Sequence, residues 1–296
     1  MTKGSAVRVR AYGVTVVLLV QSLVLAAQAS LPAPWDSVGK VLKTSGMFTG
    51  GYYRYGWPRR DITLRIGDVT VSPALALGAW AGFAGEPSAV TVMGDLVLTP
   101  DELKPVLAEL ANQHIDVTAI HNHVVGDPQI TFLHFHGEGA ALDVAQRLDR
   151  VLARTKTPRP PAAAAPQPVT IDTATIFGTL GLHGHAQGNV AQLSTVLVPG
   201  AVTAHGKTLN PALAYGTPIN IQVLDGGRAL ATGDFSIPGD KVAPVLSALT
   251  SHGITATALH SHLIGDEPKL YYMHFWADGP LADVLRGLRA ALDAAK

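Results

Sequence analysis

A stretch that occurs twice decides the fold: residues 118–136 read TAIHNHVVGDPQITFLHFH, and residues 257–276 read TALHSHLIGDEPKLYYMHFW. Each copy holds two apolar runs rich in β-branched and aromatic residues, which are typical of strands. A Gly-Asp with a nearby proline separates the runs and favours a turn. Residues i and i+2 of a strand point to the same face. Each copy therefore predicts a hairpin with its histidines grouped on one face.

This hairpin also predicts which histidines are neighbours. In the first copy, His123 should face His134 and His121 should face His136, so that four imidazoles share one patch. The second copy carries three histidines and an indole at the matching positions: His260, His262, His274 and Trp276.

The repeat extends well beyond the histidines. Pro73–Gly78 matches Pro211–Gly216, and Gly94-Asp95 matches Gly233-Asp234. In each copy a strand, a helix, two strands and a second helix follow in that order, as in a ferredoxin-like β-α-β-β-α unit. We therefore expect an α+β protein built from two tandem duplicated domains, each with additional strands ahead of that unit.

The ends of these domains follow from composition. The first repeat domain should span residues 30–156 and the second residues 170–296, with a Pro/Ala-rich, semi-rigid linker at residues 157–169. Residues 1–29 resemble a secretory signal peptide, with basic residues, a short apolar run and an Ala-Gln-Ala cleavage site. We expect a secreted or periplasmic protein with no membrane span after cleavage, and an uncleaved anchor is the alternative.

Composition excludes several classes of function. The 296 residues are 47% hydrophobic and 15% charged, with no formal net charge and no cysteine. Without cysteine there is no disulfide, thiolate metal site or cysteine nucleophile. The neutral balance argues against a nucleic-acid partner. The absence of a Walker loop and of a dinucleotide fingerprint argues against a nucleotide or flavin cofactor.

The paired histidines predict a site for a divalent transition metal. Neutral imidazole binds zinc, copper, nickel or iron, and we expect zinc first and copper second. A catalytic zinc keeps a position open for water, so a metal-dependent hydrolase is one interpretation. Four carboxylates could complete the ligand set or orient a ligand histidine: Asp95, Asp127, Asp234 and Asp266. Because the first copy has four histidines, the sequence predicts that it is the stronger of two sites.

Two other functions stay open. One is a non-catalytic binding module for a small polar or carbohydrate ligand from the cell envelope, with Trp276 and an aromatic and basic cluster in contact with it. That cluster contains Tyr53, Trp57, Arg59 and Arg60. The other is a structural envelope protein, in which the histidines form buried hydrogen-bond networks.

Three segments resemble the LppY/LpqO family, a bacterial family of exported proteins and lipoproteins catalogued as a domain of unknown function. They are Val92–Leu98 (VMGDLVL), Val117–His123 (VTAIHNH) and Tyr272–His274 (YMH). The resemblance implies export and this duplicated architecture, and it brings no catalytic activity with it. The chain lacks the cysteine to which lipoproteins of that family attach lipid.

Overall fold

The two copies of the repeated sequence form the same arrangement of elements in the computed structural model, which describes Met1 and residues 31–161 and 167–296. The first repeat forms a six-stranded antiparallel sheet. In sheet order its strands are β1 (Gly46–Thr49), β2 (Tyr52–Pro58), β5 (Gly78–Glu86), β6 (Ala89–Leu98), β8 (Thr131–Gly139) and β7 (Asp116–His121). Its helices are α1 (Ala33–Leu42), α2 (Pro73–Ala76), α3 (Pro100–Asn112) and α4 (Ala141–Leu152).

The second repeat has a six-stranded sheet with the matching order. Its strands are β9 (Gly184–Gln187), β10 (Val190–Thr195), β13 (Thr217–Val223), β14 (Arg228–Pro238), β17 (Leu270–Pro280) and β15 (Thr255–His260). Its helices are α5 (Thr173–Leu180), α6 (Pro211–Ala214), α7 (Gly239–Ser251) and α8 (Leu281–Ala294), and a 3-10 turn, η1, covers Asp225–Gly227.

Within each repeat lies the predicted β-α-β-β-α unit, β6-α3-β7-β8-α4 in the first and β14-α7-β15-β17-α8 in the second. The expected fold class, two similar α+β units, is therefore confirmed. Local chemistry explains where α3 begins. Pro100 occupies its first position, and the Glu102 carboxylate accepts a hydrogen bond of 2.9 Å from the backbone N–H of Thr99.

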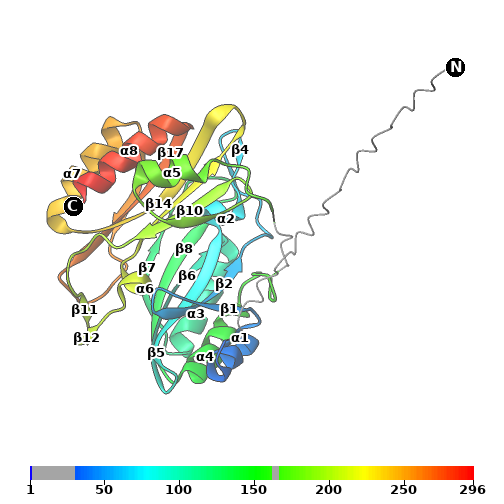
Figure 1. Ribbon diagram of the computed structural model, residues 1–296. Coiled ribbons are helices and arrows are strands. Elements are labelled where there is room, and N and C mark those ends of the chain that lie inside the picture. Colours follow the sequence, from blue (N-terminus) through cyan, green and yellow to red (C-terminus); the bar gives the residue numbers. More distant parts are fainter. Residues whose placement is uncertain (2–30, 162–166) are drawn as a thin grey trace. The chain divides into compact units, whose positions relative to one another are not determined.

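Both repeats cover one face of their sheet with helices (Figure 1). Helix α8 shows why: Val284, Leu288 and Leu292 recur at helical spacing and are all buried against the sheet and its neighbours. Burying such a face contributes roughly 1.5–3 kcal/mol per large aliphatic side chain. The helix-free face of each sheet is left to contact the other repeat.

Two excursions, which we term arms, join the repeats. The first arm (residues 59–77) contains β3 (Arg65–Ile66), β4 (Val69–Thr70) and α2, and the second arm (residues 196–216) contains β11 (Thr203–Ala204), β12 (Lys207–Thr208) and α6. Each arm packs on the other repeat. The Asn220 side-chain amide donates to the Leu75 carbonyl at 2.9 Å, and Asn210 donates to the Gly50 carbonyl at 3.0 Å.

An apolar cluster fills part of the junction between the repeats. It joins Tyr52 and Met93 of the first sheet to Leu209, Leu213 and Tyr215 of the second arm. The helix-free faces of both sheets therefore meet in a partly apolar environment, into which the histidine strands also project.

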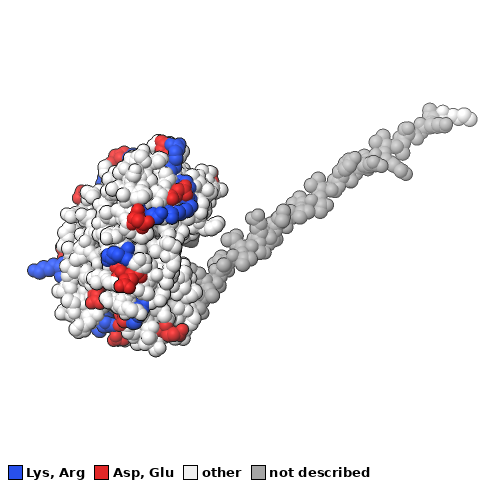
Figure 2. Space-filling view, turned by 90° about the vertical axis from the view of Figure 1, so that its left-hand side faces the viewer, with Lys and Arg blue, Asp and Glu red and all other residues white. Residues whose placement is uncertain are grey.

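Charged side chains of both signs lie close together on the face drawn in Figure 2. Ion pairs also connect the repeats: Arg228 contacts Asp68 at 3.0 Å, and Lys207 contacts Glu138 at 2.5 Å. Pairs as exposed as these stabilise by at most about 1 kcal/mol each. The arms are therefore held mainly by packing and by hydrogen bonds between side-chain amides of one repeat and backbone groups of the other.

The predicted signal peptide at residues 1–29 and the middle of the predicted linker lie outside the described residues, Met1 excepted. The domain boundaries at residues 30, 156, 170 and 296 stay predictions. Over the part of the chain that is described, no helix is long and apolar enough to cross a membrane.

Candidate metal centre

Six histidines, three from each repeat, meet between the two sheets. His121 ends β7 and His260 ends β15, while His134 and His274 lie in β8 and β17. The remaining two, His123 and His262, follow the ends of β7 and β15. Alternation along the strands sends their rings to the helix-free face. We refer to these six residues as the imidazole cluster.

Several ring contacts join the repeats within the cluster, and the three shortest relate matching positions. The ring centroids of His121 and His260 are 4.1 Å apart, those of His134 and His262 3.7 Å, and those of His123 and His274 4.2 Å. If the two repeats are exchanged, the contact between His134 and His262 becomes the contact between His274 and His123. The contact between His121 and His260 then maps onto itself. The imidazole cluster therefore lies where the pseudo-twofold symmetry brings the two repeats together, and its rings form one site.

The predicted pairing of the hairpin strands is wrong. In the sheet His121 lies opposite Phe132, and His134 lies opposite Ala119. A bulge between Val117 and Ala119 shifts the register, and the connecting loop is longer than a tight turn. As a result His121, and not His123, contacts His134, with 2.8 Å between their Nε2 atoms.

His136 lies outside the imidazole cluster, because two further residues along β8 carry it about 7 Å from His134. Its Nδ1 is 3.8 Å from Asp116, its Nε2 is 3.6 Å from Glu138, and its ring is 6.0 Å from that of His205. The predicted four-histidine patch of the first copy is thus incomplete. The sequence predicted two metal sites, with the stronger one in the first copy. This ranking does not apply, because rings from both copies belong to one cluster.

The Nε2 atoms of the cluster converge. His274 Nε2 lies 2.9 Å from His260 Nε2 and 3.1 Å from His262 Nε2. Ligand nitrogens of His121, His260, His262 and His274 all lie within 4.8 Å of one another. Around a tetrahedral zinc with bonds of about 2.1 Å, nitrogens are roughly 3.4 Å apart. The spacing therefore suits a transition metal after small ring movements.

The other ring nitrogen of three of these residues faces an acceptor. His121 Nδ1 lies 3.2 Å from the Asn122 carbonyl, and His260 Nδ1 lies 3.3 Å from the Ser261 carbonyl. Because a carbonyl oxygen only accepts, both contacts favour a proton on Nδ1 and a free lone pair on Nε2. The residue between the two histidines of each His-x-His motif thus sets the tautomer of the first one.

Asp234 is the acceptor next to the Nδ1 atom of His274. Its Oδ1 lies 2.5 Å from His274 Nδ1 and 2.9 Å from His123 Nε2. The other nitrogen of His123 contacts the Thr232 hydroxyl at 3.2 Å. A carboxylate behind a ligand histidine orients the ring and makes it a better ligand. His123, Asp234 and His274 also form a second group with metal-ligand spacing, which shares His274 with the first.

Burial favours the uncharged form of five rings of the cluster. It lowers the pKa of His134 to about 3 and that of His274 to about 4, and it lowers the pKa values of His121, His260 and His262 as well. Neighbouring imidazoles act in the same direction, since adjacent positive charges repel. At neutral pH the rings are therefore in the form that binds metals.

Two buried carboxyl groups beside the cluster differ in protonation. Burial and the charge of Asp234 raise the pKa of Asp95 well above its usual value. Burial also acts to raise the pKa of Asp234, but His274 and His123 outweigh it, and the result lies well below the usual value. The raised pKa of Asp95 favours its neutral, hydrogen-bond-donating form, and the lowered pKa of Asp234 favours its anion, a division seen in acid–base pairs.

The other two predicted carboxylates organise loops instead of the cluster. Asp266 lies in β16 (Asp266–Glu267), where its carboxylate accepts from the Leu270 backbone N–H and from Lys269 Nζ, both at 2.7 Å. Asp127 exchanges backbone hydrogen bonds of 2.8 and 2.9 Å with Arg65 of the first arm. Their predicted role at the histidines is therefore not supported.

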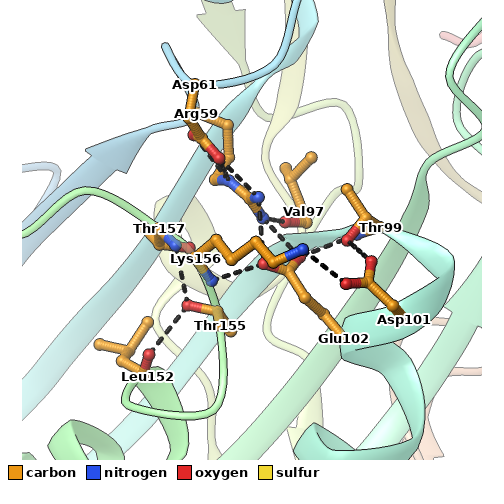
Figure 3. Close-up of polar contacts among 10 residues, drawn as sticks. All are labelled: Arg59, Asp61, Val97, Thr99, Asp101, Glu102, Leu152, Thr155, Lys156 and Thr157. Carbon is orange, nitrogen blue, oxygen red and sulfur yellow. Dashed lines mark hydrogen bonds and ion pairs between the residues drawn. The ribbon is translucent and has the colours of Figure 1, made fainter.

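The aromatic and basic cluster predicted to bind a ligand belongs to the protein core. Trp57 is fully buried and donates to the Leu42 carbonyl at 3.1 Å, while Tyr53 stacks on Trp35 with 4.0 Å between ring centroids. Arg59 is also fully buried and pairs with Glu102 at 2.8 Å and Asp61 at 2.9 Å (Figure 3). Side chains without exposed surface cannot contact a ligand, so this prediction is wrong for Trp57 and Arg59.

Two more predicted ligand-binding residues lie apart from the imidazoles. Arg60 is exposed just beyond β2, with its backbone N–H bonded to the Pro58 carbonyl at 2.9 Å. Trp276 is partly buried against the core of the first repeat. Its indole therefore contributes to packing between the repeats.

Sequence analysis missed a cavity of about 590 Å³ next to the cluster. Arg54, Trp80 and Asp95 line one part of it, and His134, His262 and Asp234 line another. The alternation of residues along β2 could have predicted that Arg54 lies on the cavity side of the sheet. Since Tyr53, Tyr55 and Trp57 point to the helices, the alternate positions, including Arg54, had to point to the opposite face.

The chain belongs to the family described as Domain of Unknown Function (DUF1259), whose model matches residues 36–154 and again residues 174–294. The two matches coincide with the two structural repeats. A comparison with curated proteins found no match.

Among solved structures, the chain is similar to EtuB from Clostridium kluyveri, with 12% identity, 86% of this chain and 90% of that chain covered, and a TM-score of 0.21. It is also similar to the trimeric bacterial microcompartment shell protein PduB, with 10% identity, 84% and 89% coverage and a TM-score of 0.22. For the fused permuted hexameric shell protein MSM0275 the values are 15%, 70%, 81% and 0.19. TM-scores this low carry no conclusion about this protein.

Proposed function

We propose that this member of the family binds one transition metal ion, zinc first and copper second, at the junction of its two repeats. The ligands are His121 from the first repeat and His260, His262 and His274 from the second. One observation carries the proposal: one ring nitrogen from each of these four histidines lies within 4.8 Å of the others. Three of the rings, those of His121, His260 and His274, also have Nδ1 beside an acceptor, which favours the metal-binding tautomer.

The alternative group of His123, Asp234 and His274 is less suited to hold the ion. His123 already uses one nitrogen toward Asp234 and the other toward Thr232. His274 Nδ1 lies 2.5 Å from Asp234 Oδ1, so we assign Nε2 as the ligand atom of His274. In this proposal Asp234 and His123 therefore contact the ligand histidine His274 and do not bind the ion.

Hydrolysis by a metal-activated water is a second candidate function, and the cavity favours it. His262 lines this cavity, so a substrate there would reach the ion. Asp95 and Asp234 lie beside it with opposite protonation, as a proton donor and a proton acceptor would. A zinc bound by four histidines has a full tetrahedral set, so this activity requires one imidazole to leave the ion or a fifth position to open.

Metal analysis of protein purified without a histidine tag tests the proposal. We expect close to one ion per chain in the wild type, and loss of that ion in His121→Ala. His136→Ala is the matched control, because it removes an imidazole from the same hairpin but outside the cluster, and it should keep the ion. A wild-type protein without metal at neutral pH, or equal losses in both variants, would refute the proposed site.

Export and the LppY/LpqO relationship complete the proposal. The basic and apolar composition of residues 1–29 supports secretion or delivery to the periplasm, where the site would encounter extracellular metal ions. Mass spectrometry of the N-terminus tests this. A chain that starts near Ser30 in the exported fraction supports it, whereas an intact Met1 on a cytoplasmic protein contradicts it.

A further inference from the structure

The cavity between the repeats has one Arg or Lys among the described residues that line it, Arg54. Its guanidinium lies 4.0 Å from the centroid of the Trp80 ring. Burial lowers the pKa of Arg54, but an arginine stays charged at neutral pH. The guanidinium is planar and lies against an aromatic ring at the wall of the cavity, and such a group can bind planar anions with two N–H donors.

Asp95 provides a second observation at the same place. Its exposed fraction is 8%, it lines the cavity, and its Oδ1 has no hydrogen-bond partner. An unpaired polar atom at such a depth costs free energy unless a ligand or water satisfies it. The carboxyl can donate one hydrogen bond in its neutral form, next to the guanidinium that donates several.

We propose that this cavity binds a small organic carboxylate, held by the Arg54 guanidinium and the Asp95 carboxyl. The inference deepens the proposed function, on which it rests for the identity of the neighbouring metal, because the other end of the ligand would lie toward His134 and His262. One arginine and one neutral donor suit a single planar charge. A phosphate dianion is better served by several cations or backbone N–H groups.

The cavity volume agrees with a ligand of this size. Small-molecule sites commonly have volumes of about 300–1,000 Å³, and this cavity has about 590 Å³. The two repeats differ at the anchor, since the strand position that holds Arg54 in the first repeat holds Gln192 in the second. Gln192 donates to the Ala74 carbonyl at 2.8 Å and contacts His185 at 2.9 Å. At this strand position the first repeat, and not the second, therefore supplies an arginine to bind the anion.

Isothermal titration with sodium D-glucuronate, D-glucose and inorganic phosphate tests the inference on the full exported chain. Glucuronate and glucose differ in the carboxylate but share ring size and most hydroxyls, so their comparison isolates the charge. We expect glucuronate to bind at least about tenfold more tightly than glucose in the wild type. Arg54→Gln, which installs the residue of the second repeat, should abolish that preference.

Two variants control for folding and for nonspecific loss of charge. Arg65→Gln removes an exposed arginine of the first arm and should leave glucuronate binding unchanged. Arg54→Lys keeps the charge without the planar guanidinium and should bind glucuronate with intermediate affinity. Metal content and melting temperature should be the same in all of these proteins.

Failure of this inference is distinguishable from failure of the metal site. If the wild type holds metal but glucuronate binds no better than glucose, or phosphate binds as tightly as glucuronate, the carboxylate site is overturned and the metal site stands. If the protein holds no metal but still binds glucuronate through Arg54, the carboxylate site stands alone. Unchanged glucuronate affinity in Arg54→Gln overturns the assignment of the anchor.

Discussion

The two repeats place the same Gly-Asp and histidine pair at the same point of the sheet, yet the pairs differ in chemistry. In the second repeat Asp234 lies 2.5 Å from His274. In the first repeat Asp95 Oδ1 lies 4.0 Å from His134, and it faces the Nε2 atom of that ring instead of Nδ1. Two histidines lower the pKa of Asp234, which favours its anion, whereas burial and the charge of Asp234 raise the pKa of Asp95, which favours its neutral form. Duplication thus fixed the positions, and the neighbouring side chains decided the charge.

Single substitutions between the repeats account for this divergence. Thr232 bonds His123 across the junction, whereas the matching residue of the first repeat, Met93, has no hydroxyl to offer His262. His262 instead stacks on Tyr272, with 3.9 Å between ring centroids. The two halves of the imidazole cluster are therefore specialised, one for orienting rings through a carboxylate and the other for forming the wall of the cavity.

The outer sides of the repeats differ as well. Only in the first repeat does a buried ion pair secure the start of the helix after the central strand, where Glu102 of α3 contacts Arg59, Thr99 and the Lys156 backbone N–H (Figure 3). Helix α7 of the second repeat begins after Pro238 without a side-chain cap. Three sets of variants test how these differences between the repeats affect stability and metal binding. They are given in order from the largest expected effect to the smallest.

Arg59→Ala should destabilise the protein by about 3–5 kcal/mol, because it leaves the buried Glu102 carboxylate without its partner. Burial acts to raise the pKa of Glu102, but hydrogen bonds from Arg59 and from backbone N–H groups outweigh it and lower that pKa. A lowered folded-state pKa stabilises the protein above the usual carboxyl pKa and loses this contribution as pH falls.

The difference between wild type and Arg59→Ala should therefore be largest near neutral pH and should shrink below about pH 4. Urea unfolding at both pH values measures it. Ser247→Ala, an exposed position in α7, provides a control that should change stability little. Equal stability of wild type and Arg59→Ala at neutral pH would show that the ion pair does not distinguish the repeats.

His274→Ala and His134→Ala compare matched strand positions of β17 and β8. We expect His274→Ala to weaken metal binding by more than about 100-fold, because it removes a ligand together with the contact to Asp234. His134 lies outside the group of four converging rings, so its removal should cost at most about tenfold. Competition with a chelator of known affinity measures both, and equal losses would contradict the asymmetric assignment of ligands.

Asp234→Asn and Asp95→Asn compare the two carboxyl groups directly. Asn at position 234 removes the negative charge behind His274 and should weaken metal binding by about 10–100-fold. Asn at position 95 resembles the neutral carboxyl already present and should leave metal affinity nearly unchanged. The same chelator competition serves here, and a larger loss for Asp95→Asn would reverse the roles that we assign to the two residues.

Much of this fold could be predicted because its signals are local. Strand alternation and the recurrence of the histidine motif indicated a duplicated β-α-β-β-α unit. The pairing of His121 with His136 failed because residues 122–130 form a longer connection than the expected tight turn, which moves the partner of His121 four positions along β8, to Phe132. Arg59 and Trp57 were misplaced because nothing in an aromatic, basic run tells which alternate residues a helix will cover.

The sequence by itself determined the repeats, their element order and the presence of three histidines and one aspartate at equivalent points of each. Those properties depend on periodicity and local conformational preference, which act over a few residues. Only the tertiary structure decided that both sets of rings meet at one junction, that His136 stays outside, and that Arg54 faces a cavity. These results depend on packing between residues more than a hundred positions apart, such as Thr232 with His123 and Asn220 with Leu75. The arms that bring the sheets together set those distances, and no local pattern encodes them.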